Sequence, residues 1–281
     1  MSKLKDRVAL VTGASRGAGK GIALTLGSEG ATVYVTGRST GENRTEALPG
    51  TVEDTAAEIG KRGGIGIGIV CDHCDDSQVE AVFDRIRTDH GRLDLLVNNV
   101  WGGYEKHVTG LGMDPFWKLT SEHWDQMFHA GLRAHFTASR LAVPLMLPQK
   151  RGLIVTTIAW DRGKFMRHLY YDVVKSAIVR MTHGMSLELR PHNVAAVALA
   201  PGWLRSERIL AAYDVKPFDL SATESTEYIG RAVAALAADP DLMRWSGQSL
   251  RVGDLAKEYG FTDIDGRVVP PFEMPEHFVL D

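Results

Sequence analysis

The feature that most constrains the fold is a glycine-rich segment near the start of the chain, because it joins two stretches of different periodicity. Residues 8–12 form a short apolar run typical of a buried strand. Residues 19–28 carry apolar side chains at helical spacing. Between them, Gly13, Gly17 and Gly19 suit a tight turn. Strand, glycine-rich turn and helix in direct succession indicate an α/β fold that begins with a βαβ unit.

The same alternation of strand and helix patterns continues along most of the chain. The expected strands are residues 8–12, 32–36, 65–70, 93–97, 153–157, 194–199 and 249–252, and the expected helices are residues 19–28, 52–61, 79–88, 124–146 and 171–190. Right-handed crossovers between such strands give a parallel sheet covered on both faces. We therefore predict a single Rossmann-type, doubly wound domain of about seven strands over residues 1–281, with an irregular tail at 256–281.

Charge and cysteine content exclude several classes of function. A formal net charge of −3 gives no broad attraction for nucleic acid or an anionic membrane. No stretch approaches the ~20 apolar residues of a spanning helix, and the charged start does not resemble a signal peptide. Cys71 and Cys74 are the two cysteines, too few for a disulfide framework or a zinc site. We expect a cytoplasmic protein that binds no metal, nucleic acid or membrane.

The glycine-rich turn has the context of a dinucleotide-binding fingerprint. Gly13 would make the tight turn, Gly17 would let the backbone approach a pyrophosphate, and Gly19 would allow close helix packing. The start of the following helix would face the anion. The residues expected to bind the cofactor in this loop are Gly13, Ser15, Arg16, Gly17, Ala18 and Gly19.

The end of the second expected strand indicates which dinucleotide would bind. Sites that prefer NAD place an acid there, about 20 residues after the glycines, to bind the ribose 2′-hydroxyl. Here the chain reads Thr36-Gly37-Arg38-Ser39 and has no acid. Arg38 and Arg16 would instead pair with a 2′-phosphate, because guanidinium groups suit that geometry. The prediction is NADP(H), the alternative being that both arginines are solvated surface charges.

Three further motifs occur in order along the chain and carry a family resemblance. They are Asn98-Asn99 after the fourth strand, Tyr171-Asp172-Val173-Val174-Lys175, and Pro201-Gly202 after the sixth strand. With the glycine-rich turn, they resemble the short-chain dehydrogenase/reductase family over residues 5–255. The segments 99–103 and 131–136 are similar to the branch that contains dehydrogenase/reductase member 1 and its bacterial relatives.

The resemblance implies an acid/base pair on one helix. Tyr171 would donate a proton to a carbonyl oxygen as hydride arrives, and Lys175 would lower the pKa of that tyrosine and bind the nicotinamide ribose. The spacing supports the pairing, because residues four apart share one helix face. A tyrosine with an ordinary pKa near 10 needs such a cation to act at neutral pH.

Two positions depart from the family pattern. The catalytic serine would lie at Ile158 or Ala159, and neither side chain forms hydrogen bonds. The helix asparagine falls at Gly131. We take Thr157 as the replacement hydroxyl. Thr156, Trp160 and Asp161 remain alternatives.

Other family positions imply further contacts with the cofactor. Asp72 would bind the adenine, Asn98 would lie on the adenosine ribose side, Pro201, Gly202 and Leu204 would surround the carboxamide, and Ser206 would cap the nicotinamide side. Trp101, Tyr104, Phe116 and Trp117 either line an apolar substrate pocket or anchor a loop. Residues 206–223 are a candidate lid, and residues 40–49 are either a flap over the 2′-phosphate or a surface insertion.

Together these expectations define an NADP(H)-dependent enzyme that reduces an apolar ketone or aldehyde or oxidises the matching alcohol. One alternative is a cofactor-binding protein with weak or no turnover, since two catalytic positions are changed. Another is a different reaction on the same fold, such as enoyl reduction or epimerisation. The resemblance also implies a homodimer or homotetramer, with Leu141, Val143 and Leu145 near one candidate face.

Overall fold

The fold is built on one parallel sheet, seen in a computed structural model that describes residues 2–105, 114–160, 163–276 and 280. The seven strands lie in the order β3-β2-β1-β4-β5-β6-β7. Their bounds are Val8–Val11 (β1), Thr32–Gly37 (β2), Ile65–Val70 (β3), Leu95–Asn98 (β4), Gly152–Thr157 (β5), Val194–Ala200 (β6) and Ser249–Arg251 (β7). All neighbouring strands pair in parallel, so the predicted sheet is confirmed.

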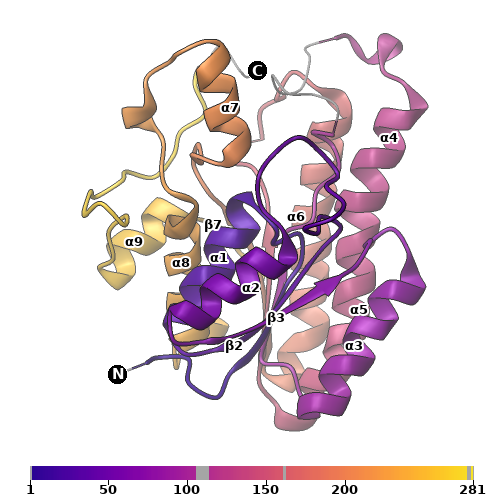
Figure 1. Ribbon diagram of the computed structural model, residues 1–281, viewed down its shortest axis with the longest axis vertical. Coiled ribbons are helices and arrows are strands. Elements are labelled where there is room, and N and C mark those ends of the chain that lie inside the picture. Colours follow the sequence, from indigo (N-terminus) through magenta and orange to yellow (C-terminus); the bar gives the residue numbers. More distant parts are fainter. Residues whose placement is uncertain (1, 106–113, 161–162, 277–279, 281) are drawn as a thin grey trace.

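Helices cover both faces of this sheet (Figure 1). Their bounds are Gly17–Ser28 (α1), Val52–Lys61 (α2), Asp76–His90 (α3), Ser121–Met127 (α4), Ala134–Met146 (α5), Leu169–Leu189 (α6), Glu207–Val215 (α7), Thr226–Ala238 (α8) and Val252–Tyr259 (α9). One buried cluster joins the sheet to α1, α2, α8 and α9. Two others join the opposite face to α3 and α5 and to α4 and α6.

The strand order reverses between β1 and β4, which creates the point where such sheets bind ligands. The segments that leave the carboxyl ends of β1, β4, β5 and β6 meet at this edge. Helices α4 and α7 project there, at the top of the view in Figure 1. Residues far apart in the sequence are thereby brought to one edge of the sheet.

The long helix expected at 124–146 is interrupted. Helix α4 passes into a π-helical segment, Phe128–Arg133, before α5 begins at Ala134. A π-helical turn accommodates an extra residue, and such turns often occur at functional sites. The interruption contains Gly131, one of the two positions that depart from the family pattern.

Helix α8 was not expected from the sequence, and it packs closely against α1. A Cβ atom on Gly21 would lie 1.9 Å from the carbonyl oxygen of Thr226, and one on Gly230 would lie 2.4 Å from Oγ1 of Thr25. These glycines therefore let the two helix backbones come together.

The tail prediction needs a correction at its start. Residues 256–259 belong to α9, because Val252, Leu255 and Ala256 form a buried apolar face. The helix ends at Gly260, whose left-handed φ of 71° suits a glycine cap.

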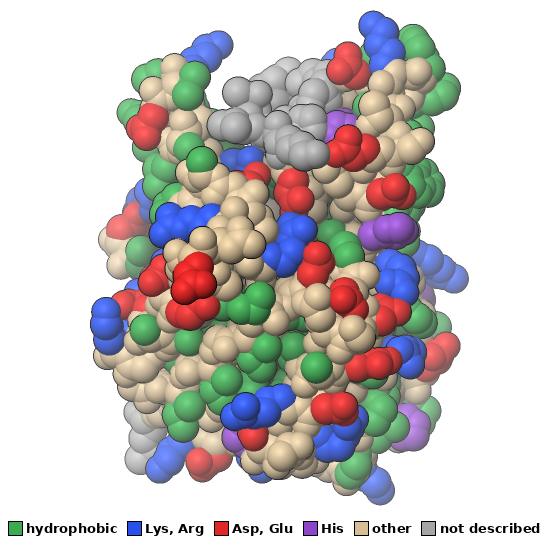
Figure 2. Space-filling view, turned by 45° about the vertical axis from the view of Figure 1, so that its right-hand side comes forward, with side chains coloured by type: hydrophobic (Ala, Val, Ile, Leu, Met, Phe, Trp, Pro, Cys, Tyr) green, Lys and Arg blue, Asp and Glu red, His purple; other side chains and the backbone are tan. Residues whose placement is uncertain are grey.

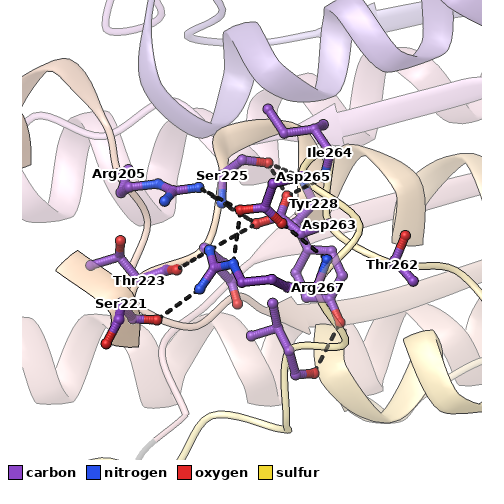
Figure 3. A network of polar contacts seen from close by, with 12 residues as sticks. Arg205, Ser221, Thr223, Ser225, Tyr228, Thr262, Asp263, Ile264, Asp265 and Arg267 are labelled. Atoms are coloured by element: carbon purple, nitrogen blue, oxygen red, sulfur yellow. Dashed lines mark hydrogen bonds and ion pairs between the residues drawn. The ribbon is translucent and has the colours of Figure 1, made fainter.

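Beyond Gly260 the chain is held by a polar network around Asp263 (Figure 3). The buried carboxylate of Asp263 accepts hydrogen bonds from the backbone N–H, at 2.9 Å, and the hydroxyl of Ser225. Arg267 donates to the carbonyl oxygens of Ser221 and Thr223 at 2.8 and 3.1 Å. The network therefore ties the tail to the start of α8 and to the segment that follows α7.

The surface shown in Figure 2 carries acidic and basic side chains intermingled, without a field of one sign. In the described part of the chain, no helix is long and apolar enough to cross a membrane.

Candidate active site

The glycine-rich turn after β1 is shaped by close backbone contacts. Gly13 has a left-handed φ of 64°, and a Cβ there would lie 2.8 Å from Cα of Val100. A Cβ on Gly19 would lie 2.4 Å from the carbonyl oxygen of Gly13. The side-chain amide of Asn99 donates to the carbonyl oxygens of Thr12 and Gly13, each at 3.1 Å. Asn99 therefore fixes the turn, a role that sequence reasoning did not assign to it.

An anionic oxygen already occupies the start of α1. The backbone N–H of Gly17 donates to Oε2 of Glu207 at 2.7 Å, and Glu207 is the first residue of α7. Gly17 has a φ of 59°, and a Cβ there would meet its nearest neighbour at 3.9 Å. The turn thus combines an open approach with a backbone donor that binds a carboxylate, which fits the pyrophosphate of a dinucleotide.

Arg38 directly follows β2, and Arg16, in the glycine-rich turn, extends its guanidinium group to the same place. Arg38 forms ion pairs with Glu105 and, at 3.8 Å, with Asp72. Arg16 donates to Oγ of Ser39 at 2.8 Å. The structure therefore brings the two guanidinium groups to the same edge, each with partners from the protein.

The segment expected as a flap packs against these arginines. Arg16 donates to the carbonyl oxygen of Pro49 at 3.2 Å and lies 3.4 Å from Oε2 of Glu46. Arg208, on α7, donates to Glu46 at 2.5 Å. Residues 40–49 are therefore linked by charge both to the glycine-rich turn and to α7.

Tyr171 and Lys175 lie in the first turns of α6. The helix is capped by His168, whose ring nitrogen accepts from the backbone N–H of Tyr171 at 3.3 Å. Nζ of Lys175 lies 4.2 Å from the ring centre of Trp101 and donates to the carbonyl oxygen of Thr157 at 3.4 Å. Burial lowers the pKa of Lys175 to about 8, so the group is still a cation at neutral pH.

Thr157 reaches this pair through its backbone. Its carbonyl accepts from Lys175, whereas its hydroxyl donates to the carbonyl oxygen of Asn98 at 3.4 Å. Successive side chains in a strand alternate between faces, and Thr157 follows Leu153 and Val155, which belong to the cluster opposite α6. This geometry does not support Thr157 as the replacement hydroxyl, and its catalytic role stays a prediction.

The alternatives to Thr157 also stay predictions. The hydroxyl of Thr156 and the indole N–H of Trp160 are buried without a hydrogen-bond partner in the part of the chain that is described. The ring of Trp160 lies 5.2 Å from the guanidinium of Arg251. Asp161 lies outside the described residues.

The glycine at the asparagine position makes room for an aromatic ring. A Cβ on Gly131 would lie 2.7 Å from the ring of Trp101 and 3.3 Å from Cγ1 of Val174. The Trp101 ring meets the Tyr171 ring edge to face, with 5.4 Å between centroids. Trp101 therefore contacts both Tyr171 and Lys175, and its ring occupies the space that a larger side chain at position 131 would need.

Tyr104 also belongs to this aromatic group. Its hydroxyl donates to the hydroxyl of Tyr171 at 3.4 Å. The sequence had placed Tyr104 only among possible lining or anchoring aromatics, because no spacing rule connects it with α6. Phe116 and Trp117 differ from it, since both are exposed and meet each other edge to face.

The remaining predicted cofactor residues lie at the same edge of the sheet. Asn98 is buried, and its side-chain amide donates to Oγ of Ser139 at 2.9 Å. Asp72 accepts from the backbone N–H of Cys74 at 2.9 Å. Ser15 is buried in the turn, and Ala18 packs against the core cluster at α1.

The segment that follows β6 is positioned by a buried acid that sequence reasoning missed. Glu224 accepts from the backbone N–H of Gly202 at 2.9 Å and pairs with Leu204 in an isolated bridge. Burial raises the pKa of Glu224 to about 7. Ser206 caps α7 by accepting from the backbone N–H of Ile209 at 3.4 Å. Pro201 lies directly after β6, at the edge where these contacts form.

The Cys-Asp-His-Cys segment forms separate local contacts. Cys71 is buried, Cys74 is exposed, and both are free thiols. His73 contacts the hydroxyl of Thr36 at 2.8 Å. Among the residues that the structure describes, no group of three metal-binding side chains is gathered in one place.

These features define a class of protein. The reversal of strand order and the glycine-rich turn, with Tyr171 and Lys175 at the same edge of the sheet, are those of a dinucleotide-binding fold.

Comparison with known proteins identifies the family. The short chain dehydrogenase family profile matches residues 7–212. Dehydrogenase/reductase SDR family member 1 of Mus musculus is 38% identical, over 97% of this chain and 88% of that protein. The 3-oxoacyl-acyl-carrier-protein reductase FabG of Escherichia coli is 26% identical, over 88% of this chain and 96% of that protein. A mutant short-chain dehydrogenase/reductase from Serratia marcescens has a TM-score of 0.73 at 26% identity, covering 89% of this chain and 97% of that one. The chain belongs to the short-chain dehydrogenase/reductase family, whose members use a nicotinamide cofactor.

Proposed function

We propose that this protein is an NADP(H)-dependent oxidoreductase that reduces an apolar ketone or aldehyde, or oxidises the matching alcohol. The observation that carries the proposal is the pair formed by Tyr171 and Lys175. The ammonium group of Lys175 lies 5.6 Å from the ring centre of Tyr171, at the edge of the sheet where ligands bind.

The two side chains divide the proton chemistry. Tyr171 donates its hydroxyl proton to the carbonyl oxygen during reduction and takes it back during oxidation. Lys175 favours the phenolate form of Tyr171, because a cation lowers the free energy of a nearby anion. A bound nicotinamide would supply or accept the hydride. The glycine-rich turn would hold its pyrophosphate through the N–H of Gly17.

Two arginines support a preference for the phosphorylated cofactor. The end of β2 carries no acid, Arg38 directly follows the strand, and the guanidinium group of Arg16 reaches Ser39 beside it. Their present partners include Glu46 and Glu105, which a 2′-phosphate would replace as the stronger, doubly charged acceptor. We expect Arg38→Ala to weaken NADPH binding ~10-fold or more while NADH binding changes little. Equal effects on both cofactors would contradict the preference.

Aromatic side chains near Tyr171 support an apolar substrate. The rings of Trp101 and Tyr104 flank it, with 5.4 and 6.3 Å between ring centroids. The Escherichia coli relative, a 3-oxoacyl reductase by name, acts on a ketone. We propose the same reaction type here.

The test is turnover with a matched variant. NADPH oxidation is followed by absorbance over a panel of apolar ketones and aldehydes, with NADPH binding measured separately by fluorescence. Activity in the wild type that is lost in Tyr171→Phe, with NADPH binding intact, supports the proposal. Tight NADPH binding without Tyr171-dependent turnover would favour a cofactor-binding protein or another reaction, such as enoyl reduction or epimerisation.

We also propose that two or four copies assemble through α4, the π-helical segment, α5 and α6. The residues Trp124, Phe128, Leu132, Phe136, Ala177 and Met181 line an open apolar groove there. The side chains expected at this face are different: Leu145 is buried in the core, and Leu141 and Val143 pack against it. Helical periodicity did not show which side of α5 faces the sheet. Light scattering of wild type and Phe136→Asp tests the assembly, since a monomeric wild type would exclude it.

We further propose a reducing, cytoplasmic environment. Its support is that both cysteines are free thiols, one of them exposed.

A further inference from the structure

A second tyrosine hydroxyl lies beside that of Tyr171, and the proposed mechanism does not yet use it. Tyr104 lies in the segment after β4, whereas Tyr171 lies in the first turn of α6, so the fold brings together residues that are far apart in the sequence. The Tyr104 hydroxyl donates to the Tyr171 hydroxyl at 3.4 Å. The two rings are stacked, with an angle of 29° and 6.3 Å between centroids.

The ring of Tyr104 is held by neighbours on several sides. Trp101 meets it edge to face at 5.9 Å, and the guanidinium of Arg208, on α7, lies 5.9 Å from its centre. Burial raises the pKa of Tyr104, so its hydroxyl keeps its proton at neutral pH and acts as a donor. The position is therefore both fixed and chemically suited to donate a hydrogen bond.

The site lacks the hydroxyl that the family resemblance leads one to expect at the end of β5. Ile158 and Ala159 carry no polar side-chain atom, and the hydroxyl of Thr157 donates to the carbonyl oxygen of Asn98. Two hydroxyl oxygens 3.4 Å apart can both lie within hydrogen-bond distance, about 2.7 Å, of one carbonyl oxygen. Tyr104 and Tyr171 satisfy that condition.

We infer that Tyr104 is the second hydroxyl donor of the active site and binds the substrate carbonyl oxygen together with Tyr171. The inference rests on the proposed carbonyl reduction. As the carbonyl carbon accepts a hydride from the reduced nicotinamide, the π electrons move to oxygen, and that oxygen takes the Tyr171 proton. Tyr171 is left as a phenolate, which the Lys175 cation stabilises, and once the substrate oxygen is protonated the Tyr104 O–H turns from it and donates to the phenolate. Tyr104 keeps its proton throughout.

The first test removes the hydroxyl and keeps the ring. In Tyr104→Phe we expect kcat to fall ~10- to 100-fold, because one donor to the developing oxyanion is lost. NADPH affinity should be little changed. Tyr170→Phe is the matched control, because its ring packs against Trp124 at 5.3 Å and it removes the same atom from the residue beside Tyr171.

The second test introduces a hydroxyl where the family resemblance places the catalytic serine. Ile158→Ser is introduced into both the wild type and Tyr104→Phe, because Ile158 packs in the cluster that contains Trp101 and Tyr171. If Tyr104 supplies the missing donor, the serine should restore part of the lost kcat in the variant and add much less in the wild type. Equal effects in both backgrounds would show that the two positions are independent and would overturn the inference.

The third test needs neither cofactor nor turnover. Tyrosinate absorbance is titrated in the wild type, Tyr171→Phe, Tyr104→Phe and the double variant, so that the differences between proteins with and without the Tyr171 hydroxyl isolate its titration in the presence and in the absence of the Tyr104 hydroxyl. Loss of a hydrogen bond to its phenolate should raise its apparent pKa by about one pH unit in Tyr104→Phe.

The outcomes separate this inference from the proposed function. Tyr171-dependent turnover that survives in Tyr104→Phe, with an unshifted titration, overturns the role of Tyr104 and leaves the reductase intact. No Tyr171-dependent turnover in the wild type overturns the reductase and with it the catalytic role of Tyr104. A lower kcat together with a raised Tyr171 titration supports both.

Discussion

Replacing Lys175 by methionine should make the protein more stable while abolishing its activity. Lys175 is 8% exposed, and burial lowers its pKa from 10.5 to about 8. A shift of that size means that the cation costs about 3 kcal/mol relative to the unfolded chain at pH 7. Methionine has a similar length and no charge. The contact with Trp101 would be lost, which offsets about 1–2 kcal/mol. We expect a net gain of about 1–2 kcal/mol at pH 7.

The pKa shift of Lys175 also determines how the stability difference between wild type and variant changes with pH. The folded-state pKa of Lys175 lies below the unfolded value, so between pH 8 and 10.5 the unfolded chain binds more protons. The wild type therefore gains stability from this group as the pH rises through that window, and Lys175→Met does not. The advantage of the variant should shrink by about 2 kcal/mol between pH 7 and 9.5.

The assay is urea unfolding of the cofactor-free protein at pH 7 and 9.5, followed by circular dichroism. Lys61→Met is the matched control, because the side chain of Lys61 is 76% exposed and no comparable change with pH is expected. A Lys175→Met protein that is less stable than the wild type by the same amount at both pH values would refute the reasoning, since the buried cation would then stabilise the fold.

Three further perturbations test other parts of the site. Gly131→Ala should cost about 1–3 kcal/mol in urea unfolding and lower kcat, because its Cβ would lie 2.7 Å from the Trp101 ring. Gly184→Ala, in an open position of α6, should instead be neutral or stabilising, and equal behaviour of the two variants would rule out the clash. Glu224→Gln should stabilise the protein by about 3 kcal/mol at pH 8 and by much less at pH 4.5, because burial raises the pKa of Glu224 from 4.5 to about 7 and the folded state therefore loses stability as the pH rises through that range. A thermal-shift difference that does not grow with pH would contradict it. Glu207→Gln should tighten NADPH binding ~5-fold in a fluorescence titration, because a neutral amide competes less well for the N–H of Gly17, and weaker binding would show that Glu207 helps to hold the cofactor.

Periodicity was enough to predict the sheet and most of its helices. The predicted strand 65–70 and helix 52–61 have the observed bounds, because Gly64 precedes the strand and Thr51 and Arg62 flank the helix. Helix α8 escaped notice although seven of its residues are buried. Its apolar stripe is at least as clear as those of α1 and α6, so the pattern could have shown the helix, whereas its close fit against α1 depends on Gly21 and Gly230, a contact between distant parts of the chain.

Some residues of the active site could likewise be predicted from the sequence, and others could not. Tyr171, Lys175 and the glycines follow fixed local spacings, so the sequence could place them. The contacts of Trp101 and Tyr104 with α6 depend on how the loop after β4 lies across the edge of the sheet. Glu224 and Glu207 reach the site from beyond β6 by tertiary packing. No pattern within a short window reports such contacts.

The fit between Trp101 and Gly131 also limits how this active site can change. An asparagine at 131 and a tryptophan at 101 would compete for the same volume, because even a single carbon at 131 comes too close to the ring. Placing asparagine at position 131 alone would overpack the site, and replacing Trp101 by a smaller residue alone would leave a cavity. A route between this arrangement and one with a helix asparagine therefore passes through a destabilised intermediate, unless both residues change together. Positions 101 and 131 must therefore change together. We expect a variant in which both residues are exchanged to fold and function, and each single exchange to fail.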